Sequence, residues 1–291
     1  MSDYLLAVVL GIVEGLTEFL PVSSTAHLRI VQAALGIDLS DPYWKTFSIV
    51  IQLGAILCLP VYFGPRLARL LRSFPRGMRG DRTALDHPIT LTLIAFVVTA
   101  IPAFLLTKVI GQHLESLRVM ALSLLVGGVV MWVVDARYER APRGGRATDT
   151  VDAMSLGQAV WIGACQVLSA VFPGTSRSMA TITAGMLGGM TRPAALEFSF
   201  FLSIPTMVAA TVYDLWKSLR PSRSGAAALG AMPGDAHSWI VLAIGFVVSF
   251  VVAYAVVAWF MSWVRRHGFA PFAIYRIVLG LTVLWWAGRM H

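Results

Sequence analysis

Two glutamates and a run of hydroxyl side chains lie close together near the start of the chain, in the segment G-I-V-E-G-L-T-E-F-L-P-V-S-S-T-A-H. Glu14 and Glu18 are four residues apart, so on a helix they share one face. Two carboxylates in an apolar segment repel each other and are costly to desolvate unless a cation or donors compensate them. Because carboxylate oxygens suit hard divalent cations, the pair predicts a Mg²⁺ or Ca²⁺ site. The spacing leaves one alternative open, a pair at the membrane surface near a helix end.

The hydroxyl run that follows the glutamates predicts a site for a phosphate. Pro21 ends a helix, and Ser23, Ser24 or Thr25 can cap the next one. A helix that begins there directs its first N–H groups and the positive end of its dipole into the protein interior, which favours an anion. His27 is close to the same helix end and is a candidate general acid or base. The alternative for His27 is a structural histidine in an apolar stretch.

A second proline-broken segment, G-A-C-Q-V-L-S-A-V-F-P-G-T-S-R-S-M, repeats this design with a change of charge. Arg177 in an apolar segment is costly unless it meets an anion, and its planar guanidinium matches a phosphate in a bidentate manner. Neutralisation of Glu14 or Glu18 is the alternative role for Arg177, and both roles hold if the two loops meet. The substrate-binding residues expected in this second loop are Gly174, Thr175, Ser176, Arg177 and Ser178.

The two segments belong to a longer sequence repeat. At a constant offset, Gly11 corresponds to Gly163 and Pro21 to Pro173. Further correspondences at nearly the same offset are F-S at 47–48 with 198–199, and A-F-V-V-T at 95–99 with G-F-V-V-S at 245–249. A repeated apolar segment that is broken by proline predicts a binding site at the interface of two repeats.

The composition is that of a membrane protein. Hydrophobic residues make up 57% of the 291 residues and charged residues only 13%, with a mean hydropathy of +0.74. Soluble proteins have about 25% charged residues, so the chain is expected to be a multi-pass membrane protein. The net charge of +8 is then assigned to cytoplasmic loops and anionic lipid surfaces, and nucleic acid is not expected as a partner.

Six segments are long and apolar enough to cross a bilayer: residues 43–63, 89–110, 119–134, 196–215, 239–261 and 272–287. Two further regions, 4–36 and 156–190, are broken by proline and predict re-entrant pairs of half-helices. Each half of the chain then has one re-entrant pair and three crossings. Because three is odd, the second repeat is inverted relative to the first.

The expected fold is therefore an all-α polytopic membrane protein. It has six transmembrane helices plus two re-entrant helix-loop-helix hairpins, arranged as an inverted-topology repeat. The chain forms a single integral membrane domain over residues 1–291. Its parts are repeat one at about 1–135, a cytoplasmic connecting loop at about 136–155, and repeat two at about 156–291.

The distribution of basic residues predicts the orientation. Loops 64–88, 136–155 and 262–270 carry twelve arginines, whereas loops 111–117 and 216–238 carry three basic residues. The positive-inside rule places the twelve in the cytoplasm, so both termini are expected on the outer side.

Several stretches resemble a known family. E-G-L-T-E-F-L-P-V-S-S-T-A-H at 14–27 and P-G-T-S-R-S at 173–178 closely resemble the two signature motifs of bacterial undecaprenyl-diphosphate phosphatases, the bacitracin-resistance family. The stretches at 45–57, 197–205 and 271–276 also look like that family. One departure is Met179, where the family usually has glycine, which puts the fine geometry of the loop beside Arg177 in doubt. The S-R-x5-H pattern of type 2 phosphatidic-acid phosphatases is absent, because Thr183 stands in place of the histidine.

This resemblance implies hydrolysis of undecaprenyl diphosphate to undecaprenyl phosphate and inorganic phosphate. The reaction recycles the carrier lipid for peptidoglycan and confers bacitracin resistance. The resemblance also implies location in the bacterial cytoplasmic (inner) membrane. The expected partners are the lipid diphosphate, membrane lipids and a second copy of the chain.

The mechanism expected from these residues is metal-assisted phosphoryl transfer. The catalytic residues are Ser24, His27, Glu18 and Arg177; Glu14 and Glu18 hold the cation; and Ser23 and Thr25 join the second loop in binding substrate. Attack by Ser24 and attack by an activated water both fit the sequence. The rival from another class is a transporter of lipid phosphates or anions, since inverted repeats with broken helices are typical of transporters. A membrane scaffold would leave Arg177 unexplained.

Overall fold

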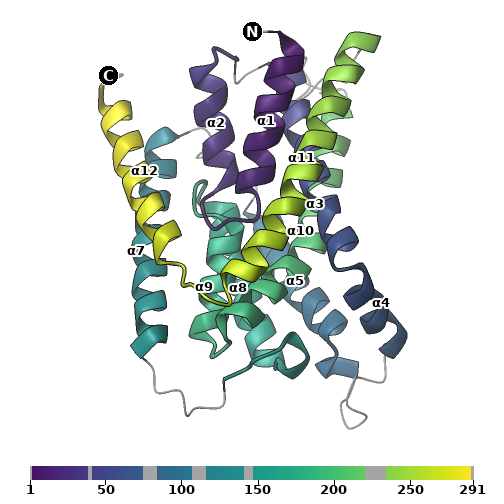
Figure 1. Ribbon diagram of the computed structural model, residues 1–291, viewed down its shortest axis with the longest axis vertical. Helices are drawn as coiled ribbons and strands as arrows, with labels where there is room; N and C mark the ends of the chain where they lie inside the picture. Colours follow the sequence, from purple (N-terminus) through teal and green to yellow (C-terminus); the bar gives the residue numbers. More distant parts are fainter. Residues whose placement is uncertain are drawn as a thin grey trace. The chain divides into compact units, whose positions relative to one another are not determined.

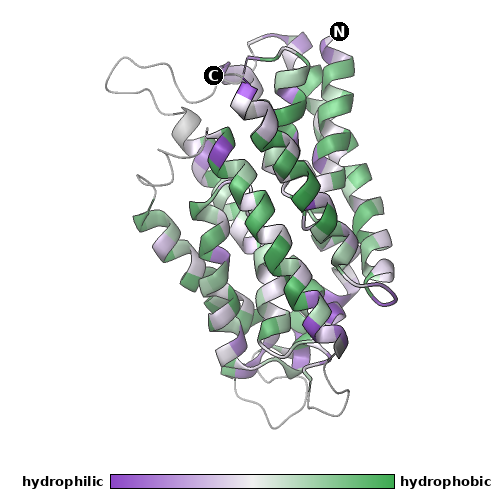
Figure 2. Ribbon diagram, turned by 90° about the vertical axis from the view of Figure 1, so that its left-hand side faces the viewer, coloured by the Kyte–Doolittle hydropathy of each residue, from purple (hydrophilic) through white to green (hydrophobic). Residues whose placement is uncertain are grey.

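The computed structural model describes residues 2–38, 41–74, 84–106, 116–140, 147–219 and 234–289. Regular structure in these ranges is helical, apart from one isolated bridge between Thr148 and Met190. Five of the described helices are long and apolar enough to cross a membrane: α3 (Pro42–Tyr62), α5 (Pro88–Leu105), α7 (Leu117–Arg140), α10 (Arg192–Leu219) and α11 (Ala236–Trp263). Much of the helical ribbon has the colours of hydrophobic residues (Figure 2). The predicted all-α membrane protein is therefore confirmed.

The boundaries of the apolar helices differ from those expected at several ends. The sixth expected crossing lies in α12 (Ala270–Arg289), whose apolar part is shorter than that of the other five. Helix α7 extends beyond 119–134 at both ends and includes residues 136–140, which were expected in a connecting loop. Helical hydrogen bonding continues through polar residues, whereas the apolar window stops at Asp135. The end of the second expected segment, 107–110, lies outside the described residues.

The two proline-broken regions each form a pair of short helices, as expected. The first region contains α1 (Asp3–Thr17) and α2 (Ser24–Ala34), and the second contains α8 (Leu156–Val171) and α9 (Arg177–Leu187). In the first region, α1 and α2 lie side by side and are joined at one end by the loop that contains Pro21 (Figure 1). The remaining elements are α4 (Gly64–Ser73) and the single turns η1 (Ala84–Asp86) and η2 (Val151–Ala153).

Two compact units can be distinguished in the chain. Unit 1 contains Met1–Phe19, Ser24–Tyr62 and Ser203–Ala258, and unit 2 contains Leu20–Ser23, Phe63–Leu202 and Trp259–His291. Each unit thus combines segments from both halves of the sequence. The tip of the first hairpin, Leu20–Ser23, belongs to the same unit as the whole second hairpin.

In unit 1, the first hairpin packs against α3 and α11. Its apolar core includes Leu10 of α1, Phe47 and Ile51 of α3, and Val241 of α11. A Cβ at Gly11 would lie 2.8 Å from the carbonyl oxygen of Gly245, so the backbones of α1 and α11 are in close approach.

In unit 2, the second hairpin repeats this packing with repeat-related residues. A Cβ at Gly163 of α8 would lie 2.5 Å from the carbonyl oxygen of Ala95 of α5. Gly163 corresponds to Gly11, and Ala95 corresponds to Gly245, in the sequence repeat. The same close helix contact therefore occurs in both units, and in each it joins a hairpin to a helix of the opposite half. This agreement supports the repeat that the sequence predicts.

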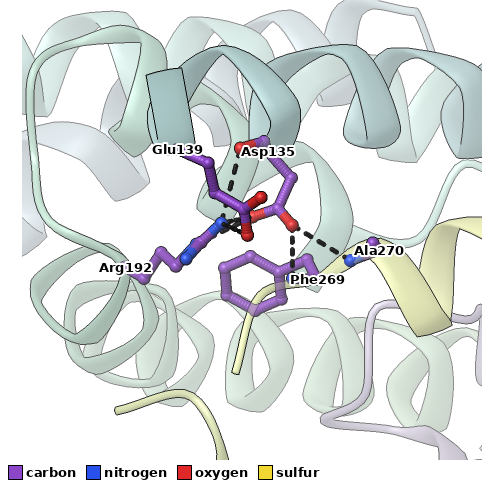
Figure 3. A network of polar contacts seen from close by, with 5 residues as sticks. All are labelled: Asp135, Glu139, Arg192, Phe269 and Ala270. Atoms are coloured by element: carbon purple, nitrogen blue, oxygen red, sulfur yellow. Dashed lines mark hydrogen bonds and ion pairs between the residues drawn. The ribbon is translucent and has the colours of Figure 1, made fainter. Parts of the chain in front are cut away.

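A buried carboxylate fixes the start of α12 in unit 2. Asp135 of α7 is 2% exposed, and its Oδ2 accepts hydrogen bonds from the backbone N–H groups of Phe269 (2.8 Å) and Ala270 (3.1 Å) (Figure 3). Its Oδ1 accepts from Nε of Arg192 at 2.8 Å, and Arg192 also meets Glu139 at 3.0 Å. Helices α7 and α12 run side by side (Figure 1). Asp135 therefore acts as an N-terminal anchor for α12.

Replacement of Asp135 by alanine is expected to destabilise the protein strongly. The change leaves the Arg192 guanidinium without its buried partner and two backbone N–H groups without an acceptor, which costs about 3–5 kcal/mol. The matched control is Glu139→Ala, which removes the other, 61% exposed partner of the same arginine and should cost under about 1 kcal/mol. Thermal unfolding of both variants in detergent measures the difference. Equal destabilisation by the two changes would contradict the assigned role of Asp135.

A buried histidine caps the start of α5. Nδ1 of His87 accepts from the backbone N–H of Ile89 at 3.2 Å. Ser73 donates to the carbonyl of Leu70, so its Oγ is available to accept from Nε2–H of His87 at 3.0 Å. The side chain is therefore held in the neutral tautomer with its proton on Nε2. Burial lowers the pKa of His87 below its usual 6.5, and the nearby charge of Asp152 acts in the opposite direction.

This histidine predicts a pH dependence of stability. A lowered pKa in the folded state means that the unfolded state binds more protons as the pH falls below about 6.5. The contribution of His87 is therefore complete above that pH and is lost as the pH falls toward the pKa of the folded state. His87→Asn retains a capping side chain without the titration. Its unfolding temperature should fall less than that of the wild type between pH 7.5 and 5. Parallel curves for the two proteins would exclude His87 as the source.

Candidate active site

The two glutamates of the first hairpin are buried and share one helix face. Glu14 is 0% exposed and Glu18 is 6% exposed. The backbone N–H of Glu18 donates to the carbonyl of Glu14 at 2.9 Å, so the helical spacing continues through Glu18. The side chain of Ser24, the first residue of α2, donates to Oε2 of Glu18 at 2.6 Å. The structure thus brings Glu18 and Ser24 together, and both carboxylates are inside the protein.

The remaining predicted residues of α2 follow Ser24 in its first turn. His27 is half-buried, while Thr25 is exposed. Ala26 and Leu28, on either side of His27, are buried. The imidazole of His27 therefore belongs to the same helix end as the Ser24 hydroxyl.

The second loop is a sharp turn that leads into α9. Pro173 and Gly174 are buried, and Gly174 has φ of +93°, a left-handed conformation that glycine adopts without strain. A side chain at Gly174 would meet the carbonyl oxygen of Met120. Ser176 is the N-cap of α9, because its Oγ accepts from the backbone N–H of Met179 at 3.3 Å. Arg177 is the first residue of the helix, half-buried, and Ser178 behind it is buried.

Both hairpins place a serine in a left-handed backbone conformation immediately before the second helix. Ser23 has φ of 73° and Ser176 has φ of 67°, and these are the non-glycine residues with positive φ in the described ranges. For a residue other than glycine this conformation costs about 1 kcal/mol or more and is concentrated at functional sites. The residues that begin the two helices are Ser24 and Arg177, so the hydroxyl of one loop and the guanidinium of the other hold equivalent positions.

A buried arginine of α12, which the sequence analysis assigned no role, joins the tips of the two hairpins. Arg276 is 0% exposed, and its Nη1 donates to the carbonyl of Pro21 at 3.1 Å. Its Nη2 donates to the carbonyls of Gly174 (3.1 Å) and Thr175 (2.9 Å) in the second loop, and of Ser123 (3.2 Å) in α7. The signal that could have found Arg276 was present, because an arginine inside an apolar segment marks a specific role.

Met179, which departs from the pattern of the resembling family, is accommodated by a glycine of α7. A Cβ at Gly127 would lie 2.6 Å from the terminal methyl carbon of Met179 and would also meet Nη2 of Arg276. The larger side chain therefore occupies space that Gly127 leaves empty. It packs beside Arg276 without displacing the cap at Ser176.

A pair of buried hydroxyls supports the first turn of α9. Oγ1 of Thr181 lies 2.9 Å from the carbonyl oxygen of Arg177 and 2.7 Å from Oγ of Ser199 in α10. These contacts link the helix that begins at Arg177 to its neighbour. The sequence analysis assigned no role to Thr181 or Ser199.

Glu14 and Glu18 form a donor set that fits a hard divalent cation. They offer buried carboxylate oxygens, which Mg²⁺ and Ca²⁺ prefer. Among the described residues no group of three or more histidine, cysteine, aspartate or glutamate side chains could hold a metal. The described part of the protein therefore supplies at most two carboxylates to such an ion. Water and substrate oxygens would complete its coordination, as is usual for Mg²⁺ at phosphate sites.

The fold and the site together define a polytopic helical membrane protein with two proline-broken hairpins whose loops carry buried polar groups. The family described as bacitracin resistance protein BacA matches residues 7–282. The chain belongs to this family, because the match covers nearly its full length.

Proteins named undecaprenyl-diphosphatase are similar to the chain throughout. The protein from Koribacter versatilis is 68% identical over 287 residues, which are 99% of each chain. The protein from Thermus thermophilus is 42% identical and covers 94% of this chain and 93% of its own. The protein from Sorangium cellulosum is 44% identical and covers 96% of this chain and 85% of its own.

Proposed function

We infer that this protein is an undecaprenyl-diphosphate phosphatase. It hydrolyses undecaprenyl diphosphate to undecaprenyl phosphate and inorganic phosphate, recycles the carrier lipid for cell-wall synthesis and confers bacitracin resistance. The observation that carries this conclusion is the 68% identity, over 99% of both chains, to a protein named for that activity. The site agrees with the chemistry, because buried carboxylates, hydroxyls, an arginine and a helix start are the groups that phosphoryl transfer requires.

The second loop supplies the binding groups in the proposed mechanism. Arg177 binds oxygens of the diphosphate with its guanidinium and stabilises the negative charge that develops on them. Thr175, Ser176 and Ser178 contribute hydroxyls, and the start of α9 contributes backbone N–H groups. The positive φ of Ser176 supports this assignment, because strained backbone conformations cluster at functional sites.

The first loop supplies the reacting groups. In the proposed step Glu18 accepts the hydroxyl proton as Ser24 attacks the terminal phosphorus, and the hydrogen bond from Ser24 to Glu18 at 2.6 Å supports this role. The bond from that phosphorus to the bridging oxygen then breaks, and undecaprenyl phosphate leaves. His27 is the general acid or base, and water releases phosphate from the serine. Ser23 and Thr25 are supporting donors.

Attack by water is the alternative to attack by Ser24. In that reaction Glu18 orients the water, and Ser24 only holds the carboxylate in place. Trapping of labelled phosphate on Ser24 during turnover supports attack by serine. Full activity of the Ser24→Ala variant excludes attack by Ser24.

Glu14 and Glu18 are the proposed holders of a Mg²⁺ or Ca²⁺ ion. Such an ion supplies positive charge that stabilises the phosphate oxygens during transfer. Activity should then fall on addition of a chelator and return with one of the two ions.

Six crossings and two re-entrant hairpins form the proposed membrane topology. The protein lies in the bacterial inner membrane with both termini on the outer side, and two copies form a dimer. The distribution of arginines supports this orientation. Labelling of cysteines introduced near each terminus in intact cells tests the orientation, and the mass of the purified protein in detergent tests the dimer.

The decisive test of the function is release of inorganic phosphate from undecaprenyl diphosphate by purified protein in detergent. A phosphatase releases phosphate without a membrane gradient. A transporter, the rival suggested by inverted repeats, releases none in detergent but moves the lipid phosphate or anion across vesicles. Transport without hydrolysis would overturn the proposal.

A further inference from the structure

Arg276 holds backbone carbonyls of both hairpin loops and is itself shielded from solvent. Its Nη1 donates a hydrogen bond to the carbonyl of Pro21, two residues before Ser23. Its Nη2 donates to the carbonyl of Thr175, directly before Ser176. Ser23 and Ser176 are the two serines with positive φ. The side chain is 0% exposed. The Nη1 and Nη2 groups of this guanidinium are thus directed at peptide oxygens.

These hydrogen bonds determine the directions in which the carbonyl and N–H groups of the second loop point. In a trans peptide the carbonyl and the following N–H point in opposite directions. Because the Thr175 oxygen accepts from Arg276, the N–H of Ser176 points away from Arg276 within that peptide plane. The Gly174 oxygen is held by the same nitrogen, so two successive carbonyls of the turn are fixed toward the buried cation.

The guanidinium is itself fixed from two sides. The guanidinium occupies space that is open because residue 127 of α7 is a glycine, since a Cβ at Gly127 would meet Nη2 of Arg276. Helix α12, which carries Arg276, is anchored at its start by Asp135 through the N–H groups of Phe269 and Ala270 (Figure 3). The anchor lies less than two helical turns before Arg276.

We infer that Arg276 is a positioning residue for phosphoryl transfer: it pulls carbonyls of both hairpin tips to one buried point and so aims the backbone N–H groups at the start of α9 at the substrate. The role rests on the proposed function, and it differs from that of Arg177, because Arg276 acts through the loops and does not touch the diphosphate. A single guanidinium with several acceptors also makes the relative placement of the two tips depend on one side chain.

The test is the turnover of Arg276→Lys. Lysine keeps the positive charge, but its single nitrogen cannot reproduce a planar fork with two bonding nitrogens. With undecaprenyl diphosphate as substrate, kcat should fall at least about tenfold while KM changes less than about threefold. Misaligned N–H groups weaken stabilisation of the charge that develops in the transition state more than they weaken binding of the substrate. The matched control is Arg289→Lys, an exposed arginine of the same helix, which should retain wild-type kinetics.

A second variant guards against simple loss of folding. Gly127→Ala leaves Arg276 in the chain but puts a methyl group where its Nη2 lies, so it should lower kcat in the same way. Both variants are assayed at a temperature below their measured unfolding transitions. The inference is supported if kcat falls while the protein is folded. It is overturned if Arg276→Lys keeps at least half of the wild-type kcat, if only KM rises, or if activity returns fully on cooling.

The failure of this inference can be distinguished from failure of the proposed function. Wild-type protein that releases no phosphate contradicts the function, and the role of Arg276 falls with it. An active wild type with an equally active Arg276→Lys overturns the positioning role alone.

Discussion

Replacement of Arg177 by alanine is expected to lower kcat for undecaprenyl diphosphate by about 10³-fold, the scale on which phosphoryl-transfer enzymes depend on a transition-state arginine. Arg177 is the first residue of α9 and follows the N-cap Ser176, which has a strained backbone conformation. Its side chain is therefore attached at the N-terminal end of the helix, which favours an anion. Arg177→Lys should retain a small part of the activity, since it keeps the charge but loses the bidentate fork. Initial rates of phosphate release at saturating substrate measure the effect.

The control for this prediction is another arginine on a short helix. Arg69 lies exposed on α4, and Arg69→Ala should leave the rate within about twofold of the wild type. Unfolding temperatures of both variants should stay close to that of the wild type. A folded Arg177→Ala protein with near-normal hydrolysis would remove the arginine from the mechanism.

The second large effect is expected for Glu18→Gln, with a loss of kcat of at least about 10²-fold. Glutamine has nearly the same shape, but it is neutral and cannot accept the proton from Ser24, which donates to Glu18 at 2.6 Å. The Glu18→Gln variant also has one carboxylate fewer to bind a cation, so its activation should need a higher Mg²⁺ concentration than that of the wild type. The rate of phosphate release is measured at several Mg²⁺ concentrations.

Thr17→Val serves as the control on the same helix. Oγ1 of Thr17 donates to the carbonyl of Val13 within α1, at 2.7 Å, so its removal should change kcat by less than about twofold. If Glu18→Gln and Thr17→Val have the same small effect, the buried carboxylate takes no part in the reaction. If Glu18→Gln is much slower but its residual rate depends on Mg²⁺ concentration as that of the wild type does, Glu18 is a proton acceptor and not an ion ligand.

The helices and the two short hairpins could be predicted from the sequence because each depends on local patterns. Apolar runs give the positions of α3, α5, α10 and α11, and a proline lies in the loop that follows the first helix of each hairpin. The C-terminal end of α7 could not be predicted, because Asp135 interrupts the apolar pattern and becomes buried only when Arg192 and the start of α12 compensate it. A charged residue of this kind predicts a loop from the sequence, but it lies within a helix in the folded protein.

The candidate site was predictable where side chains are close in the sequence. Glu18 and Ser24 are six residues apart, and the turn between α1 and α2 brings them together. Arg276 shows the limit, because its loop acceptors lie more than 100 residues away, in two different loops. Nothing local to Arg276 specifies those partners. The left-handed conformations of Ser23 and Ser176 are also products of the folded loop, since an isolated serine does not prefer them.

The central claim is that the two hairpin loops act together on one lipid diphosphate. The most direct measurement is the initial rate of phosphate release from undecaprenyl diphosphate by purified wild type, Glu18→Ala and Arg177→Ala. We predict rapid release by the wild type and a loss of at least about 100-fold in each folded variant, one from each loop. Near-wild-type release by either variant, or no release by the wild type, would contradict the claim.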